Sequence, residues 1–133
     1  MTNAIAAKAA NGNTVILMQA TDPDVLISTT EEIPGFKTKK YVGVVWASSA
    51  RTLDTASEIG AMLKSIGGGD LPAFRKMLNE ARHSVLHELA ATAKARGANA
   101  IVGVRMESAS IVAGTIDVYA YGTAVVAEKE TRK

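Results

Sequence analysis

The chain has 133 residues, which fits one domain, and its 47% hydrophobic and 21% charged residues are typical of a globular protein. The formal net charge is only +2 and acidic and basic residues interleave, so the sequence lacks the basic stripe that nucleic-acid-binding proteins carry. There is no cysteine, which excludes disulfides, thiolate zinc sites and cysteine nucleophiles and suits a cytoplasmic location.

Residues 1–23 are expected to form an N-terminal extension that is partly disordered or adds an extra strand. Within it, the apolar run Thr14–Met18 predicts a strand. The first residues lack a sustained apolar core, so they do not resemble a signal peptide. No apolar run in the chain approaches the roughly 18 residues that a membrane span requires. We expect a single domain over residues 24–128 and a charged tail over residues 129–133.

The domain is expected to begin with two strands. A short strand is predicted at Val25–Thr29, and the turn that follows it, Glu31–Phe36, contains the turn-forming pair Pro34 and Gly35. The segment Lys40–Ser48 is rich in β-branched and aromatic residues, which predicts a buried strand.

Two helices are predicted next. The segment Arg51–Ile66 has apolar residues at helical spacing with charged residues on the other side, and Gly67–Gly69 ends it. A second helix is predicted from about Leu71 to Arg96, with Asp70 as its cap and Gly97 as its stop. Its apolar stripe consists of Phe74, Leu78, Ala81, Val85, Leu89 and Ala93.

Two further strands, Ala98–Glu107 and Thr115–Glu128, are expected to form an antiparallel pair. In the expected register, one face carries the pairs Arg105–Asp117, Gly103–Tyr119 and Ile101–Tyr121. The other face is apolar and should lie against the helices, with Val102, Val104 and Met106 meeting Ile116, Val118 and Ala120. This order of elements predicts an α+β fold: a two-layer sandwich of a mostly antiparallel sheet with two helices packed on one face.

The only two histidines, His83 and His87, lie four residues apart on the second predicted helix, so their side chains are neighbours. Ser84 follows the first histidine where zinc proteases have glutamate, which excludes that enzyme class. The helical wheel places the pair opposite the apolar stripe, which favours a solvated helix face. The alternative is a divalent metal site with a third ligand from Glu80 or from another subunit.

Three other groups are candidate ligand-binding residues. Gly68 and Gly69 precede a helix and would cradle an anion, or they would simply connect two helices. A second group, Trp46, Ser48 and Arg51, lies at a strand-to-helix junction where it would line a pocket, although a core tryptophan and a solvated arginine are favoured. The third group would line a polar cavity or a subunit interface, or would form a plain exposed sheet pair: Arg105, Asp117 and Tyr119.

Several segments resemble the YbjQ-like family over about residues 25–127: "VLISTTEEIPG", "YVGVVWASSAR", "GANAIVGVR" and "YAYGTAVV". The resemblance implies a small α+β subunit that assembles into a homopentamer, in a family classed by name as heavy-metal-binding. One departure concerns the glycine loop. Where many members have Gly-Gly-Arg-Ser, this chain has Gly68, Gly69, Asp70 and Leu71, so a basic anion-binding loop is lost.

The leading hypothesis is a cytoplasmic, homopentameric, non-enzymatic protein that binds a small ligand or a metal ion, because no catalytic constellation is visible. One alternative is an interaction module without a ligand, whose assembly presents a surface to a protein partner. A third hypothesis is an enzyme whose site lies between subunits and uses Arg51, Arg105, Asp117 or Tyr119.

Overall fold

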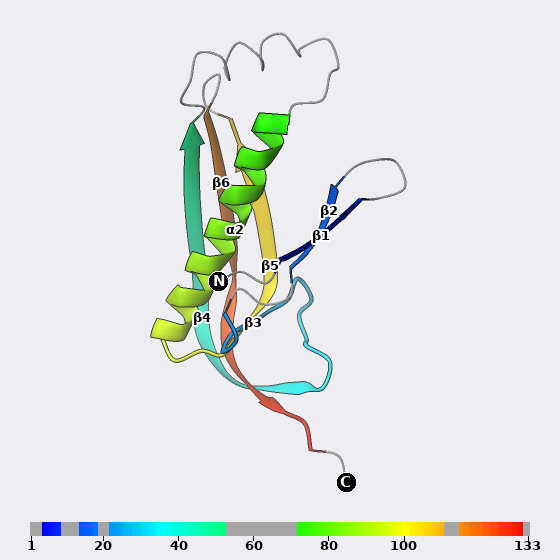
Figure 1. The fold of residues 1–133 in the computed structure, drawn as a ribbon. Helices are drawn as coiled ribbons and strands as arrows, with labels where there is room; N and C mark the ends of the chain where they lie inside the picture. The colour runs from blue at the N-terminus through cyan, green and yellow to red at the C-terminus, as the bar shows by residue number, and fades with distance from the viewer. Residues whose placement is uncertain (1–3, 9–13, 19–21, 53–71, 111–114, 132–133) are drawn as a thin grey trace.

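The computed structural model describes residues 4–8, 14–18, 22–52, 72–110 and 115–131 (Figure 1). Two short strands form a separate antiparallel pair, β1 (Ala4–Lys8) and β2 (Thr14–Met18). The larger sheet has the strand order β3-β5-β6-β4. Its strands are β3 (Leu26–Ile27), β4 (Phe36–Thr52), β5 (Ala100–Ala109) and β6 (Thr115–Lys129), and helix α2 (Pro72–Ala95) lies along one face.

The predicted α+β class and mostly antiparallel sheet are confirmed. Strand β6 pairs antiparallel with both β4 and β5, and only the short β3–β5 pairing in the larger sheet is parallel. The two-helix layer is not supported, because the described residues contain one helix. The first predicted helix is wrong at its beginning, since Arg51 and Thr52 continue β4 by pairing with β6. The remainder of that helix, with Gly68 and Gly69, lies outside the described residues.

Helix α2 confirms the second predicted helix and most of its apolar stripe. Ala81, Val85, Leu89 and Ala93 are fully buried against the sheet, as the steps of three and four residues require. Gly97 has a φ of 86°, and its N–H donates to the carbonyl of Lys94 at 3.0 Å. The next N–H reaches the carbonyl of Ala93, also at 3.0 Å. These two bonds form the left-handed glycine stop that satisfies the last helical carbonyls. No helix in the described part of the chain is long and apolar enough to span a membrane.

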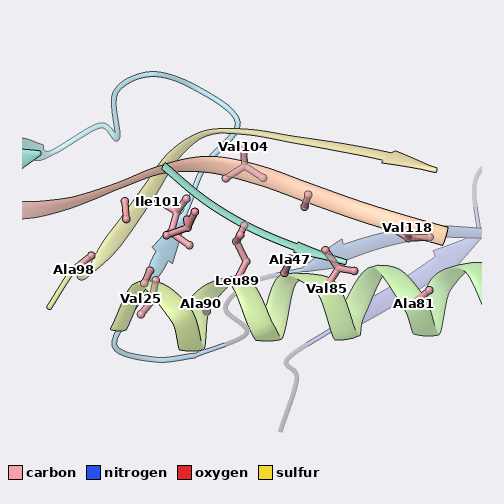
Figure 2. Packing of buried hydrophobic residues seen from close by; sticks show 14 of the residues in the cluster. Val25, Ala47, Ala81, Val85, Leu89, Ala90, Ala98, Ile101, Val104 and Val118 are labelled. Atoms are coloured by element: carbon pink, nitrogen blue, oxygen red, sulfur yellow. The ribbon is translucent and has the colours of Figure 1, made fainter. Parts of the chain in front are cut away.

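The core between α2 and the sheet is built largely from small side chains (Figure 2). Alanines come from both layers, and Leu89, Val85 and Val118 are among the largest side chains that are fully buried. The backbones of helix and sheet approach closely at the alanines, since short side chains leave little to separate them.

From Arg105 onwards, the predicted pairing of β5 with β6 is wrong by four residues. Arg105 lies opposite Tyr121, whereas the prediction placed it opposite Asp117, so its partner moves by 121 − 117 = 4 positions. Asp117 lies opposite Ala109. An even shift leaves side chains on their predicted faces, because the side-chain period of a strand is two. Met106 therefore still meets an apolar partner beneath the helix, Ala120.

Before Gly103, the predicted faces of β5 are wrong because of a bulge at this glycine. Gly103 has a φ of 63°, in the region that favours glycine, and the β5–β6 register is irregular between Val102 and Arg105. On the N-terminal side of the bulge, the side chains lie on the faces opposite to those predicted. Ile101, predicted to face Tyr121, is buried in the core beneath α2. Val102, predicted to face the helices, packs in a second apolar cluster with Phe36.

The close packing at Gly122 generates a stability prediction. A Cβ added there would lie 2.8 Å from the Cγ2 of Ile101 and 3.1 Å from the backbone carbonyl of Val102. Gly122→Ala is therefore expected to lower the free energy of unfolding by about 1–3 kcal/mol. Chemical denaturation at fixed protein concentration measures this, with exposed Ser108→Ala as the control, expected to change stability by at most about 0.5 kcal/mol. Equal stability of the two variants would contradict the close approach.

Candidate functional site

The candidate site is the outer face, the side of the four-stranded sheet that α2 does not cover (Figure 1). Because β6 pairs with a neighbour on each side, residues of three strands align across this face. Its rows are Val44–Thr123–Val102, Trp46–Tyr121–Arg105 and Ser48–Tyr119–Glu107. The two candidates Trp46 and Arg105 therefore flank Tyr121 within one row.

Large apolar side chains on the outer face are exposed. The exposed fraction is 73% for Trp46, 65% for Tyr41, 58% for Val44 and 41% for Tyr121. The interpretation of Trp46 as a core residue, and of its strand as buried, is wrong on this face. The reason is topological: β4 is an edge strand, and α2 covers only the side that carries Val45 and Ala47.

The guanidinium of Arg105 is not paired with Asp117. Its Nη1 donates to the carbonyl oxygen of Thr29 at 2.9 Å and to that of Val104 at 3.0 Å. These bonds attach the segment after β3 to the face of β5. Arg105 thus has a structural task in the single chain.

Tyr119 and Glu107 form the clearest polar contact of the outer face. The Tyr119 hydroxyl donates to Oε2 of Glu107 at 2.7 Å. This hydrogen bond, together with the negative charge of Glu107, raises the pKa of Tyr119 above its ordinary value. The phenol is therefore held neutral, as a hydrogen-bond donor, and is poorly suited to act as a base at neutral pH.

The candidate group Trp46, Ser48 and Arg51 does not converge. Trp46 and Ser48 lie on the outer face, whereas Arg51 points to the helix side, where its Nη2 donates to the Ser84 hydroxyl at 2.6 Å. A second bond runs from its Nε to the Ser49 hydroxyl at 3.3 Å. Arg51 therefore ties the end of β4 to α2, and these residues do not line one pocket.

The two histidines have different surroundings. His87 is exposed, as the solvated-face interpretation expects, but His83 is half-buried and its Nδ1 is buried without a hydrogen-bond partner among the described residues. The described residues contain no group of three or more histidine, aspartate or glutamate side chains placed to hold a metal ion. Zinc sites use three or four protein ligands. The described residues of one chain therefore do not form a complete metal site.

Two carboxylates near the end of α2 form ion pairs with a lysine. Lys94 Nζ lies 2.7 Å from Oδ2 of Asp24 and 3.6 Å from Oδ2 of Asp22. The backbone N–H of Asp24, followed by the charge of Lys94, lowers the pKa of Asp22, and the bond to Asp24 raises the pKa of Lys94. The ammonium group of Lys94 therefore occupies the position beside these oxygens that a metal cation would need.

Sequence reasoning missed Tyr41 and Val44 as part of the outer face. Both lie in a segment whose β-branched and aromatic composition predicts a strand but does not say which face is covered. One signal was available. Trp46 and Ser48 alternate with Val45 and Ala47, so one face carries the bulkiest side chain and a hydroxyl, while the other carries small apolar residues.

Comparisons with known proteins agree on the family. The family model described as "Putative heavy-metal-binding", of the YbjQ type, matches residues 25–128. A UPF0145 protein of Clostridioides difficile is 41% identical over 106 residues, which are 80% of this chain and 95% of that protein. A UPF0145 protein of Halalkalibacterium halodurans is 38% identical over 106 residues, covering 80% of this chain and all (100%) of that protein.

A solved structure of another bacterial protein is similar in fold. It is a protein of unknown function from Pediococcus pentosaceus, assigned to the DUF74 family. Its TM-score is 0.53 at 18% identity, and the match covers 78% of this chain and 98% of the other. The likeness shows a shared fold and nothing about activity.

The Tyr119–Glu107 contact generates a prediction about pH. Glu107→Gln removes the charge that disfavours tyrosinate, so the pKa of Tyr119 should fall towards its ordinary value. A raised pKa contributes stability that is present below the unfolded pKa and is lost as pH rises through the folded pKa. Ultraviolet titration of tyrosinate measures the shift, with Tyr119→Phe assigning the signal. Glu128→Gln, which alters an exposed carboxylate beside Lys39, is the control and should leave the titration unchanged.

Proposed function

The chain belongs to the YbjQ-like family, and from its outer face we propose that it is a cytoplasmic, non-enzymatic binding protein that assembles with copies of itself. The observation that carries the proposal is the exposure of Trp46, Tyr41, Val44 and Tyr121 on one sheet face. The homopentamer implied by the family resemblance is the stoichiometry that we propose.

The composition of the outer face supports self-association. Monomeric proteins rarely leave large apolar patches open, and tryptophan and tyrosine are the residues that dominate interface energetics. Burial of each large side chain stabilises an assembly by roughly 1.5–3 kcal/mol. Trp46 and Tyr121 are adjacent by register, so a partner would cover both at once.

The free edge of β4 supports the same proposal. This strand of 17 residues is hydrogen-bonded to β6 on one side and is the last strand of its sheet. Its first half carries Lys37, Lys39 and Lys40, charges of the kind that keep sheet edges from pairing. From Val44 to Ala50 the strand has no charged residue. Pairing with a second chain is therefore best tolerated along the half that also carries Trp46.

The non-enzymatic part of the proposal rests on how the polar groups are used. Glu107 accepts a bond from Tyr119, Arg105 donates to two backbone carbonyls, and Arg51 donates to hydroxyls of Ser84 and Ser49. Each has a structural role within one chain. Metal binding by His83 and His87 stays a prediction, since it would require a third donor that the described residues do not place beside them.

The assembly proposal predicts the effect of a charge on the outer face. Trp46→Lys should raise the dissociation constant of the assembly by at least about tenfold, which is equivalent to about 1.4 kcal/mol. The reason is that an ammonium group would have to be desolvated at the interface in place of the indole. Sedimentation velocity and native mass spectrometry of the untagged protein measure the change. Ala91→Lys adds the same charge to an exposed position of α2, outside the outer face, and serves as the control. Wild-type protein that is monomeric at high concentration would sink the proposal.

A further inference from the structure

A cavity of about 430 Å³ opens between the turn before β4, the start of β4 and the end of β6. Among its lining residues, only Val102 belongs to the rows of the outer face described above. Its volume falls within the range of about 300–1,000 Å³ that small-molecule sites occupy. The turn containing Ile33 and Phe36, which in sequence is only a chain reversal, contributes one wall.

The floor of the cavity is apolar. Ile33, Phe36, Val102 and Ala127 line it, and the same residues belong to a hydrophobic cluster that is separate from the core under α2. The Gly103 bulge creates this floor, because it turns Val102 away from the helix side. The floor can therefore take up an apolar group without disturbing the main core.

Hydrogen bonds hold the walls in place. The N–H of Glu130 donates to the carbonyl of Gly35 at 2.8 Å, which ties the turn to the end of β6. The side chain of Asn99 clamps Ala127 on both sides, accepting from its N–H at 2.7 Å and donating to its carbonyl at 2.8 Å. Gly35, with a φ of 83°, provides the tight reversal. The cavity is thus shaped before a ligand arrives, which lowers the ordering cost of binding.

Among the residues that line the cavity, the charged side chains have a negative balance. Glu32 and Glu130 contribute two carboxylates and Lys37 one ammonium, and all three side chains are exposed. Within the described ranges none of the three forms an ion pair, in contrast to nearby Glu128, which lies 3.7 Å from Lys39. Lys37 can neutralise only one of the two carboxylates. A cationic ligand therefore fits the charged lining, and an apolar body fits the floor.

We propose that this cavity binds a small organic ammonium ion with a compact apolar body. Its ammonium group would lie between Glu32 and Glu130, and its apolar part would cover Phe36 and Val102. The inference does not rest on the proposed self-assembly, since every residue that it uses belongs to one chain.

The test is a titration of the full chain with benzylammonium as the probe. Heteronuclear NMR spectra monitor the binding. Saturable shifts are expected at Gly35, Ala127 and Glu130. Benzyl alcohol, with the same ring and no charge, and benzoate, with the opposite charge, should each bind more weakly. Glu32→Gln and Glu130→Gln should each weaken benzylammonium binding roughly two- to fivefold, as exposed ion pairs do. The matched control is Glu128→Gln, which removes a neighbouring carboxylate outside the cavity and should leave the affinity unchanged.

Three results would overturn the proposal. The first is benzyl alcohol binding as tightly as benzylammonium, which would make the cavity an apolar site without charge selection. The second is an equal loss of affinity in Glu128→Gln and Glu130→Gln, which would indicate a general surface charge effect. The third is zinc shifting the same amides and losing affinity in the glutamate variants while benzylammonium shifts nothing. The NMR spectrum of each variant shows directly whether its fold is intact.

Discussion

The structure depends on one constraint: a helix can cover only one face of a sheet. Helix α2 buries its stripe of Ala81, Val85 and Leu89 against β4, β5 and β6, and small residues on both layers bring the backbones together. In the described part of the chain nothing covers Trp46 on the opposite side. The same packing that completes the core therefore leaves an aromatic face open, and the proposed association with another copy would cover it.

The two ends of the outer face differ in how far other residues cover them. Near the start of β4, Ile33 and Phe36 pack against the second apolar cluster. Around Trp46 and Val44 no such cover exists among the described residues. The cavity lies at the covered end and the proposed interface at the open one, so one face can support both a small-ligand site and subunit contact.

Local patterns in the sequence predicted helix α2 well, but they placed the start of another helix on the end of β4 and predicted the strand pairing poorly. The period of the α2 stripe and the stop at Gly97 are short-range properties, so Pro72–Ala95 was predicted within one residue at each end. The β5–β6 register depends on where the connecting turn lies and on the Gly103 bulge, which exchanges Ile101 and Val102 between faces. Neither is visible in the hydrophobic pattern, because an apolar strand with both faces buried has no alternation to read.

The candidate site was harder to predict for a related reason. His83 and His87 were identified by spacing, but spacing cannot reveal that a third donor is missing from the described residues. Arg51 and Trp46 are close in sequence and were grouped together, yet the pleat sends them to opposite faces. Glu32 and Glu130 are far apart in sequence, and only the pairing of β4 with β6 brings them to one cavity.

The most direct test of the central claim is acrylamide quenching of the fluorescence of Trp46, the only tryptophan in the chain. If copies of the chain cover the outer face, the indole should be shielded from quencher, with blue-shifted emission, at concentrations where the protein assembles. Unfolding in denaturant should remove that protection. Quenching as efficient in the native protein as in the unfolded chain would mean that the face stays open to water, and the account of self-association would be wrong.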